Sequence, residues 1–348
     1  MANNQPAPKT FWQVAARHKD SFYQGAFAFG QPIRVDFVKS GYKSQLRLNI
    51  NGTIGVTSGT ITDPDTISNW FPIMGIKSSQ GGYLHSYSMR DLIDFNNRMF
   101  PVAGPLLSPT YAGIAVGTTS TQPVNMTVVI PISLNDGLNV ETGLLNTQNG
   151  RNTFTLEIYC ANVTDLVGAG TCALATPALT VELEEVYYDA VDNQPNVIPP
   201  KFNAIVKLRT ESHANVPSNS TFDVPYPVNP VLIDAIHRVV ENSVASHSHV
   251  NQIAMRTNFT QQIEWRYGTD IREENYRQLA KTTRNGTFWL NFCDDGAAVN
   301  ETRMRDWINS LAATQLDTLF YTSSAFVSTN SRVDSIYREV VPLAIAGG

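Results

Sequence analysis

Hydrophobic and polar residues alternate in several separate stretches of this chain, and this pattern most limits the possible fold. In residues 45–56, Leu46, Leu48 and Ile50 alternate with polar side chains. Successive side chains of a strand point to opposite faces of a sheet, so the alternation predicts strands with one buried face. The other strand candidates of the first half are residues 32–39, 71–76, 125–132, 153–160 and 179–188.

A proline-rich stretch separates this series from a second one. Residues 189–201 contain three prolines, and the pair Pro199-Pro200 removes two donors from any strand ladder. Strand candidates after it are residues 202–209, 255–259, 286–293, 316–328 and 331–344. Both halves run from an opening strand through a long excursion and a short helix to a closing strand rich in Glu, Tyr and Val. The halves share this order without residue-level identity, which predicts two domains of similar architecture.

Three segments show helical spacing. In residues 9–23, the residues Phe11, Trp12, Ala15, Ala16 and Lys19 fit one face, with Thr10 as an N-cap. Residues 89–100 and 271–283 form the other two. A further segment, residues 229–244, has helical spacing but lies where the first half has a long strand. We expect at least its second half to be a strand.

The composition favours a protein that packs against copies of itself. Charged residues make up only 16% of the 348 residues, and hydrophobic residues 42%, enough for a core in each half. Uncharged polar surfaces avoid both like-charge repulsion and the desolvation of many ions. A polar, loop-rich β-protein without such a role fits the composition equally well. The net charge of −5 argues against direct nucleic-acid binding.

Cysteine usage and the N-terminus predict synthesis in the cytosol. Cys160, Cys172 and Cys293 have no CxxC spacing, so they are expected to be free thiols and not a disulfide framework or a zinc site. The N-terminus has no signal-peptide pattern, and no apolar stretch is long enough to span a bilayer.

Candidate catalytic and metal-binding residues have simpler structural explanations. His247 and His249 have no nearby Cys or carboxylate in the sequence to complete a metal site, and Asp294-Asp295 precedes a glycine as in an ordinary turn. Glu182, Glu184 and Glu185 could be paired carboxylates of a glycosidase, but outward-facing acids or intersubunit partners of Arg are the preferred interpretation. No nucleophile-elbow, zincin, P-loop or Rossmann motif is present. We therefore expect no enzyme activity, cofactor or metal.

Aromatic residues and glycine pairs are assigned structural roles as well. Trp70, Trp265, Trp289 and Trp307 are expected to anchor a core or an interface, although a sugar-binding platform uses such residues too. The pair Gly81-Gly82 is expected to form a turn, and Gly347-Gly348 a tail.

With this order of elements, the chain resembles the double-jelly-roll major capsid proteins of tectivirus-type bacteriophages, whose icosahedral shells enclose a membrane. The resemblance covers nearly the whole chain in element order. It depends on spacing, without a sharp motif. It is clearest in four stretches: residues 27–54, 126–159, 181–200 and 274–295.

The resemblance implies a homotrimer whose six sandwiches form a nearly hexagonal tile of a capsid lattice. It also implies contacts with neighbouring capsid and vertex proteins, and an N-terminal segment that faces the internal membrane. The residues expected at that membrane are Lys9, Phe11, Trp12, Arg17 and Lys19. Each cation near anionic headgroups contributes about 1 kcal/mol. The alternative is a helix that caps the sandwich or contacts a neighbouring subunit. Deletion of residues 1–20 is expected to leave a folded trimer with impaired particle assembly.

These observations predict an all-β protein of two consecutive eight-stranded jelly-roll sandwiches with short helices, including an N-terminal amphipathic helix. The expected domains are an N-terminal helical segment (1–23), a first jelly roll (24–190), a linker (191–201) and a second jelly roll (202–348). The expected function is that of a major capsid protein in the virion, made in the host cytoplasm. The alternatives are a receptor- or glycan-binding spike and a polysaccharide-active enzyme on a β-sandwich.

Overall fold

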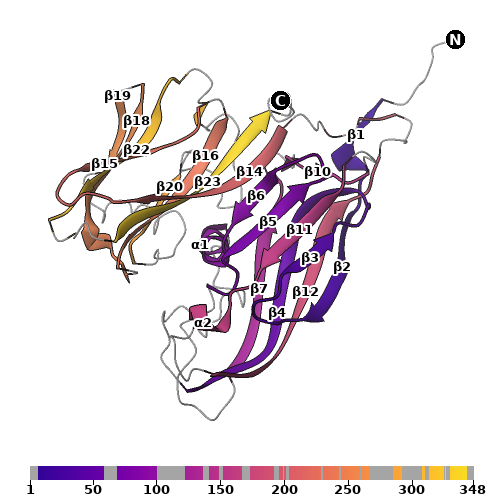
Figure 1. Ribbon diagram of the computed structural model, residues 1–348. Coiled ribbons are helices and arrows are strands. Elements are labelled where there is room, and N and C mark those ends of the chain that lie inside the picture. The colour runs from indigo at the N-terminus through magenta and orange to yellow at the C-terminus, as the bar shows by residue number, and fades with distance from the viewer. Residues whose placement is uncertain are drawn as a thin grey trace. The chain divides into compact units, whose positions relative to one another are not determined.

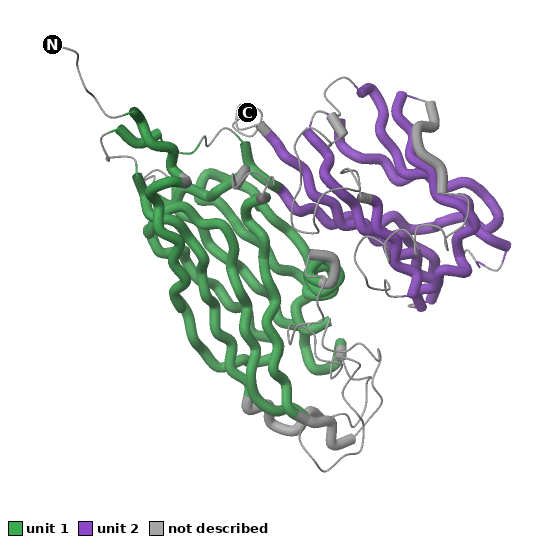
Figure 2. Tube along the Cα trace, turned by 180° about the vertical axis from the view of Figure 1, so that it is seen from behind, with its two compact units in different colours: residues 1–96, 102–206 green, residues 97–101, 207–348 purple. Residues whose placement is uncertain are grey.

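The protein consists of two compact units joined within one chain (Figure 1). The first unit contains Met1–Asn96 and Val102–Val206, and the second contains Asn97–Pro101 and Lys207–Gly348 (Figure 2). The structure, a computed structural model, describes residues 7–58, 69–99, 122–135, 141–148, 152–166, 173–191, 196–198, 200, 204–228, 230–242, 244–258, 260–265, 285–291, 308–309, 313–324, 326 and 330–342.

The first unit is built mainly from strands. Its elements are β1 (Lys9–Thr10), the 3₁₀ helix η1 (Phe11–Gln13), β2 (Arg17–Ala26), β3 (Ile33–Asp36), β4 (Tyr42–Ser58), β5 (Ile73–Ser78), β6 (Tyr83–Tyr87), α1 (Met89–Met99), β7 (Gln122–Pro131), β8 (Leu134–Asn135), β9 (Glu141–Thr142), β10 (Leu145–Asn146), β11 (Phe154–Tyr159), α2 (Val163–Leu166), β12 (Ala173–Tyr188) and β13 (Val197–Ile198).

The second unit is built from strands and one described 3₁₀ helix. Its elements are β14 (Ala204–Ala214), which starts at the boundary, β15 (Thr221–Pro225), β16 (Val231–Glu241), β17 (Val244–Ala245), η5 (His247–His249), β18 (Val250–Thr257), β19 (Thr260–Trp265), β20 (Thr287–Asn291), β21 (Ile308–Asn309), β22 (Leu316–Thr322) and β23 (Ser331–Pro342).

The two units repeat one sheet topology. In the first unit, one sheet runs β2-β12-β4-β7, with β10 also on β4, and the other runs β3-β11-β5-β6. In the second unit, β14-β23-β16-β20 and β15-β22-β18-β19 have the same order, with β17 and β21 also on β16. Among the described residues, each unit therefore has two main sheets of four strands each. Antiparallel pairing joins β2-β12-β4-β7 and β3-β11-β5-β6 in the first unit, and β23-β16-β20 and β15-β22-β18-β19 in the second. This arrangement confirms the predicted pair of eight-stranded jelly rolls.

Alternation along the long strands places the core. Leu46, Leu48 and Ile50 of β4 are fully buried, whereas the residues between them are partly exposed. The tryptophans whose side chains can be placed support the core assignment. Trp70 is buried and stacks on Phe27 with ring centroids 5.5 Å apart, and Trp289 is 4% exposed. The side chains of Trp265 and Trp307 lie outside the described residues.

The predicted N-terminal helix over residues 9–23 is wrong. The segment forms the short strand β1, the 3₁₀ helix η1 and then the strand β2, which pairs along its length with β12. Helical spacing is a weak signal in a short segment, and the open edge of β12 offers the main chain a full ladder of hydrogen bonds. Because β2 crosses residue 23, this segment is part of the first sandwich.

The ambiguous segment, residues 229–244, is a strand along most of its length. Its residues 231–241 form β16, which pairs with β23 on one side and with β20, β21 and β17 on the other. The residues on both faces of β16 are mostly buried, which explains why its pattern mimics a helix.

Helix α1 confirms the prediction for residues 89–100, and Gly81 and Gly82 form the β5–β6 turn with positive φ angles. The helix predicted over residues 271–283 lies outside the described residues. No helix in the described ranges is long and apolar enough to cross a membrane.

Candidate assembly surfaces and buried charge clusters

The N-terminal segment is folded onto the first unit. Phe11 is 1% exposed and meets Tyr42 and Tyr188 edge to face, with ring centroids 5.3 and 5.6 Å away. A side chain buried in this way cannot enter a membrane interface, so the predicted membrane contact of Phe11 is wrong. The side chain of Trp12 lies outside the described residues.

The cations of this segment have different environments. Lys9 in β1 and Arg17 at the start of β2 are exposed. Lys19 is also exposed, but its ammonium nitrogen lies 2.8 Å from a carboxylate oxygen of Glu184. Lys9 and Arg17 therefore present their charge outward, whereas the charge of Lys19 is largely compensated within the sheet.

Residues 9–18 also form hydrogen bonds with the proline-rich stretch, residues 189–201. β1 pairs in parallel with β13, and the Lys9 amide donates to the Asn196 carbonyl at 2.8 Å. The Asp189 amide donates to the Ala16 carbonyl at 3.1 Å, and the Asp189 carboxylate lies 2.8 Å from the His18 ring. Part of the stretch predicted as a linker is therefore attached to the first unit through the N-terminal segment.

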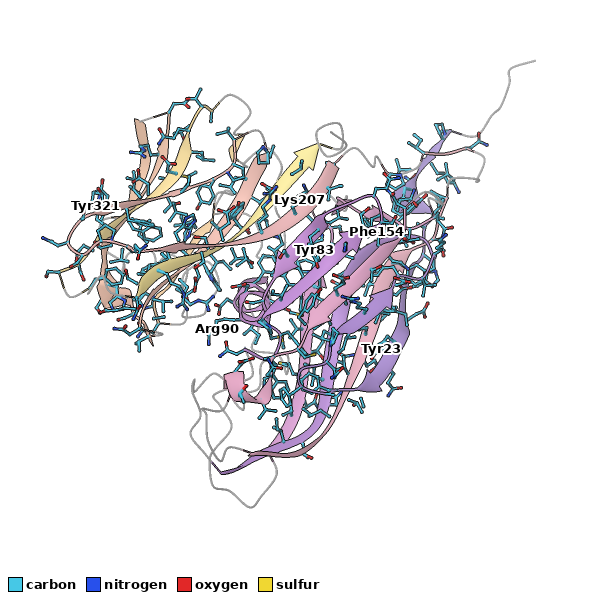
Figure 3. The ribbon with its side chains drawn as sticks, viewed as in Figure 1. Tyr23, Tyr83, Arg90, Phe154, Lys207 and Tyr321 are labelled. Atoms are coloured by element: carbon cyan, nitrogen blue, oxygen red, sulfur yellow. The ribbon has the colours of Figure 1, made fainter. Side chains whose placement is uncertain are left out.

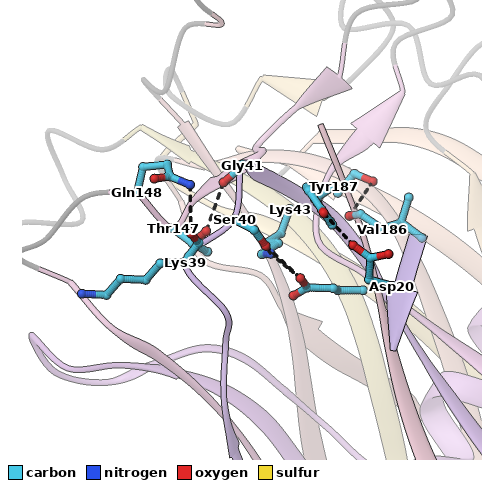
Figure 4. Close-up of polar contacts among 11 residues, drawn as sticks. Asp20, Lys39, Ser40, Gly41, Lys43, Thr147, Gln148, Val186 and Tyr187 are labelled. Atoms are coloured by element: carbon cyan, nitrogen blue, oxygen red, sulfur yellow. Dashed lines mark hydrogen bonds and ion pairs between the residues drawn. The ribbon is translucent and has the colours of Figure 1, made fainter. Parts of the chain in front are cut away.

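A buried ion pair connects β4 and β12 of the first unit (Figure 4). The Lys43 ammonium, 0% exposed, lies 2.7 Å from a carboxylate oxygen of Glu185, 2% exposed. Ser40 joins them, since its hydroxyl accepts from Lys43 at 2.6 Å and donates to Glu185 at 2.9 Å. The Tyr187 ring lies 4.4 Å from the Lys43 nitrogen. Burial lowers the pKa of Lys43, and the hydrogen bond to Glu185 opposes this shift.

Hydrogen bonds extend this cluster to neighbouring strands. The Tyr187 hydroxyl donates to Asp20 of β2 at 2.6 Å, which raises the pKa of Tyr187 to about 12. Figure 4 also shows the Thr147 hydroxyl donating to the Gly41 carbonyl, at 3.0 Å. The cluster thus ties β2, β4, β12 and the loop before β4 together.

The prediction of outward-facing or intersubunit acids on β12 holds only in part. Glu182 and Glu184 are partly exposed, and Glu184 pairs with Lys19 of the same chain. Glu185 is buried, so the prediction is wrong for this residue. Adjacent strand residues point to opposite faces, and Glu185 lies on the core side with Leu183. Glu184 and Glu185 therefore cannot act together as a catalytic pair.

The second unit has a corresponding cluster. Asp234 of β16 and Arg338 of β23 are directly opposite in register and form a buried bidentate ion pair, with Nε 2.9 Å from one carboxylate oxygen. Next to it, Glu339 is 0% exposed and pairs with Arg209 of β14 at 2.6 Å. The closing strand of each unit therefore carries two adjacent charges, one paired to the strand on each side.

A neutral histidine lies inside the second core. His237 of β16 is fully buried, with one ring nitrogen 2.7 Å from the Tyr226 hydroxyl and the other 2.7 Å from the Ser335 hydroxyl. Burial lowers the pKa of His237 to about 3. With all its ring nitrogens bonded, this histidine has a structural position and no route to a substrate.

The structure does not bring His247 and His249 together as a metal site. They form the ends of η5, where the Gly286 amide donates to His247 at 3.1 Å and His249 lies 3.3 Å from Glu241. Among the described residues, no group of three or more His, Cys, Asp or Glu side chains could hold a metal ion. Cys160 is a free thiol, whose pKa burial raises to about 12. Asp294 and Asp295 lie outside the described residues.

Comparison with solved structures identifies the architecture. The crystal structure of the STIV MCP superimposes with a TM-score of 0.72 at 11% identity, covering 94% of this chain and 97% of that chain. The fold is a double jelly roll. A model of the PBCV-1 virus capsid gives 0.60 at 9% identity, covering 94% of each chain. The major capsid protein P2 of bacteriophage PM2 gives 0.55 at 12% identity, covering 94% and 98%. No family model and no curated protein matches the chain.

Proposed function

We propose that this double-jelly-roll chain is a major capsid protein that trimerises and tiles an icosahedral shell. The observation that carries the proposal is the repeated sheet order of the two units, over a chain that aligns almost end to end with viral capsid proteins. Two similar sandwiches per chain give six in a trimer, so a threefold assembly has nearly sixfold outlines and fills a flat lattice. Its location would be the virion.

The chemistry of the described residues supports a structural role. Lys43 and Glu185, and Asp234 and Arg338, are buried charges paired with each other, and the partly exposed Glu184 of β12 pairs with Lys19 of the same sheet. Paired groups of this kind fix neighbouring strands in place. We propose that the chain works by assembly and has no enzymatic activity.

We further propose that the N-terminal end contacts the internal membrane through its outward charges. Lys9 and Arg17 support this, because they are exposed and their charges can meet anionic headgroups. Neighbouring capsid and vertex proteins are the other proposed partners, and no nucleic acid is expected in direct contact.

Sedimentation velocity and electron microscopy of the purified protein test the capsid proposal. We expect a trimer and, in images, a tile with pseudo-hexagonal outline that is present in hundreds of copies in particles. A stable monomer without any higher assembly, or turnover of a glycan that is lost on changing one carboxylate to an amide, would contradict it.

A further inference from the structure

The outer face of the sheet β3-β11-β5-β6 carries an exposed aromatic and apolar patch. Of the five large hydrophobic side chains that are exposed among the described residues, two lie on it: Ile73 at 49% and Tyr83 at 41%. Ile73 and Lys77 project from the same face of β5, and Arg34 of β3 lies across β11 from them. We call Arg34, Asp36, Ile73, Lys77, Tyr83 and Glu157 the Tyr83 patch.

Tyr83 (Figure 3) is fixed across the sheet by a glycine and a carboxylate. A Cβ atom on Gly75 would lie 2.5 Å from the Tyr83 ring, so the ring occupies the space that only glycine leaves free. The Tyr83 hydroxyl donates to Glu157 at 2.6 Å, and this hydrogen bond raises the pKa of Tyr83. The ring is thus held in one orientation and remains a neutral phenol.

The charges around the ring balance. Arg34 lies 3.6 Å from Glu157, which is directly opposite it in register. In the next row, Thr155 has Asp36 on one side and Lys77 on the other, and it donates to Asp36 at 2.6 Å. Two cations and two carboxylates therefore alternate across neighbouring strands, with no net charge.

We propose that the Tyr83 patch is a contact between copies of this chain, which rests on the proposed capsid function. The whole chain carries a net charge of −5, so copies repel one another except where a neutral, mixed-charge surface lets them meet. A fixed tyrosine loses little conformational entropy on binding, and Tyr and Arg are enriched at the energetic centres of interfaces.

The area of the patch is only part of what a stable interface needs, so the patch would be the centre of a larger contact. Four strands about 4.8 Å apart span about 14 Å and five residues of about 3.3 Å each span about 17 Å, which gives roughly 240 Å². A stable interface buries about 800 Å² on each partner, so the remaining contact area comes from surfaces around the patch.

Sedimentation velocity on point variants of the full chain tests this assignment. Ile73→Asp and Tyr83→Ala should each weaken self-association at least about tenfold, as expected for residues at an interface centre. Lys77→Glu, at an exposed position that leaves the core intact, should also weaken it by adding negative charge. The matched control is Ile198→Asp, because Ile198 is 50% exposed in the same unit and lies in β13, which belongs to a different sheet. Thermal unfolding confirms that each variant is folded.

The outcomes separate the two proposals. If the wild-type chain forms trimers and particles and the patch variants associate equally well, the patch assignment is overturned and the capsid function stands. Equal weakening by Ile198→Asp also overturns the assignment, as does normal self-association with lost binding of another virion protein. A wild-type chain that stays monomeric overturns the capsid function itself.

Discussion

Ser44 and Ile233 are corresponding residues of the two units, and each forms a β-bulge. Ser44 lies in the pair β4–β12 and Ile233 in the corresponding pair β16–β23. Each is the third residue of its strand, β4 or β16. The pairing of β4 with β12 passes from Gln45 to Lys43 and skips Ser44, and the pairing of β16 with β23 skips Ile233. A bulge redirects the side chains beside it, and in both units a buried ion pair lies next to the bulge.

Removing one partner of the Lys43–Glu185 pair should destabilise the first unit. Lys43→Met leaves the Glu185 carboxylate buried without its counter-charge, which costs roughly 3–5 kcal/mol. We expect the unfolding transition of the first unit to move to lower urea concentration by a corresponding amount.

The double variant Lys43→Met/Glu185→Leu is the control for this effect. It removes both charges and keeps the volume, so it should recover most of the lost stability. Unchanged unfolding of the single variant would show that the buried pair does not stabilise the first unit.

The part of the N-terminal segment that begins at Phe11 should be essential for folding, whereas the residues before it should not. Deletion of residues 1–8 removes no buried side chain described in the structure and should leave the melting temperature unchanged. Deletion of residues 1–20 removes Phe11, the Lys19–Glu184 pair and part of β2, and Phe11→Ala alone should cost about 3–5 kcal/mol.

This expectation replaces the one drawn from sequence, in which loss of residues 1–20 spared the fold. The two deletions are compared by thermal unfolding followed by circular dichroism. A chain lacking residues 1–20 that melts with the wild-type chain would show that the N-terminal segment is dispensable for the sandwich.

The fold was predictable because it depends on patterns that repeat along long strands. Leu46, Leu48 and Ile50 alternate over enough residues to mark a buried face, and the two closing strands look alike in composition. The buried pair was not predictable. Lys43 shares its sequence parity with Gln45 and Arg47, which indicates the outer face, and only the bulge at Ser44 turns it inward.

The Tyr83 patch also left no sequence signal, because its glycine, carboxylate and ring come from three strands. The helix predicted around Phe11 was wrong for a related reason. Its helical spacing was real, but the partners that decide its conformation, Tyr42 and Tyr188, are far away in the sequence.

The second unit should lose stability in acid because of His237. An unfolded histidine binds a proton near pH 6.5, whereas burial and, second, the charge of His213 lower the pKa of His237 to about 3 in the fold. Between these two pH values the unfolded chain binds more protons than the folded chain. The free energy of unfolding therefore decreases by about 1.4 kcal/mol for each pH unit by which the pH is lowered.

His237→Gln tests this slope, since glutamine does not titrate and retains hydrogen-bonding groups toward Tyr226 and Ser335. The free energy of unfolding of the second unit is measured by urea titration at several values between about pH 6 and pH 4. The variant starts from lower stability at neutral pH, because its amide fits the site less well, but its stability should decline less steeply as the pH falls. Parallel pH dependences for the variant and the wild-type chain would mean that His237 is protonated in the fold or that another group governs acid unfolding.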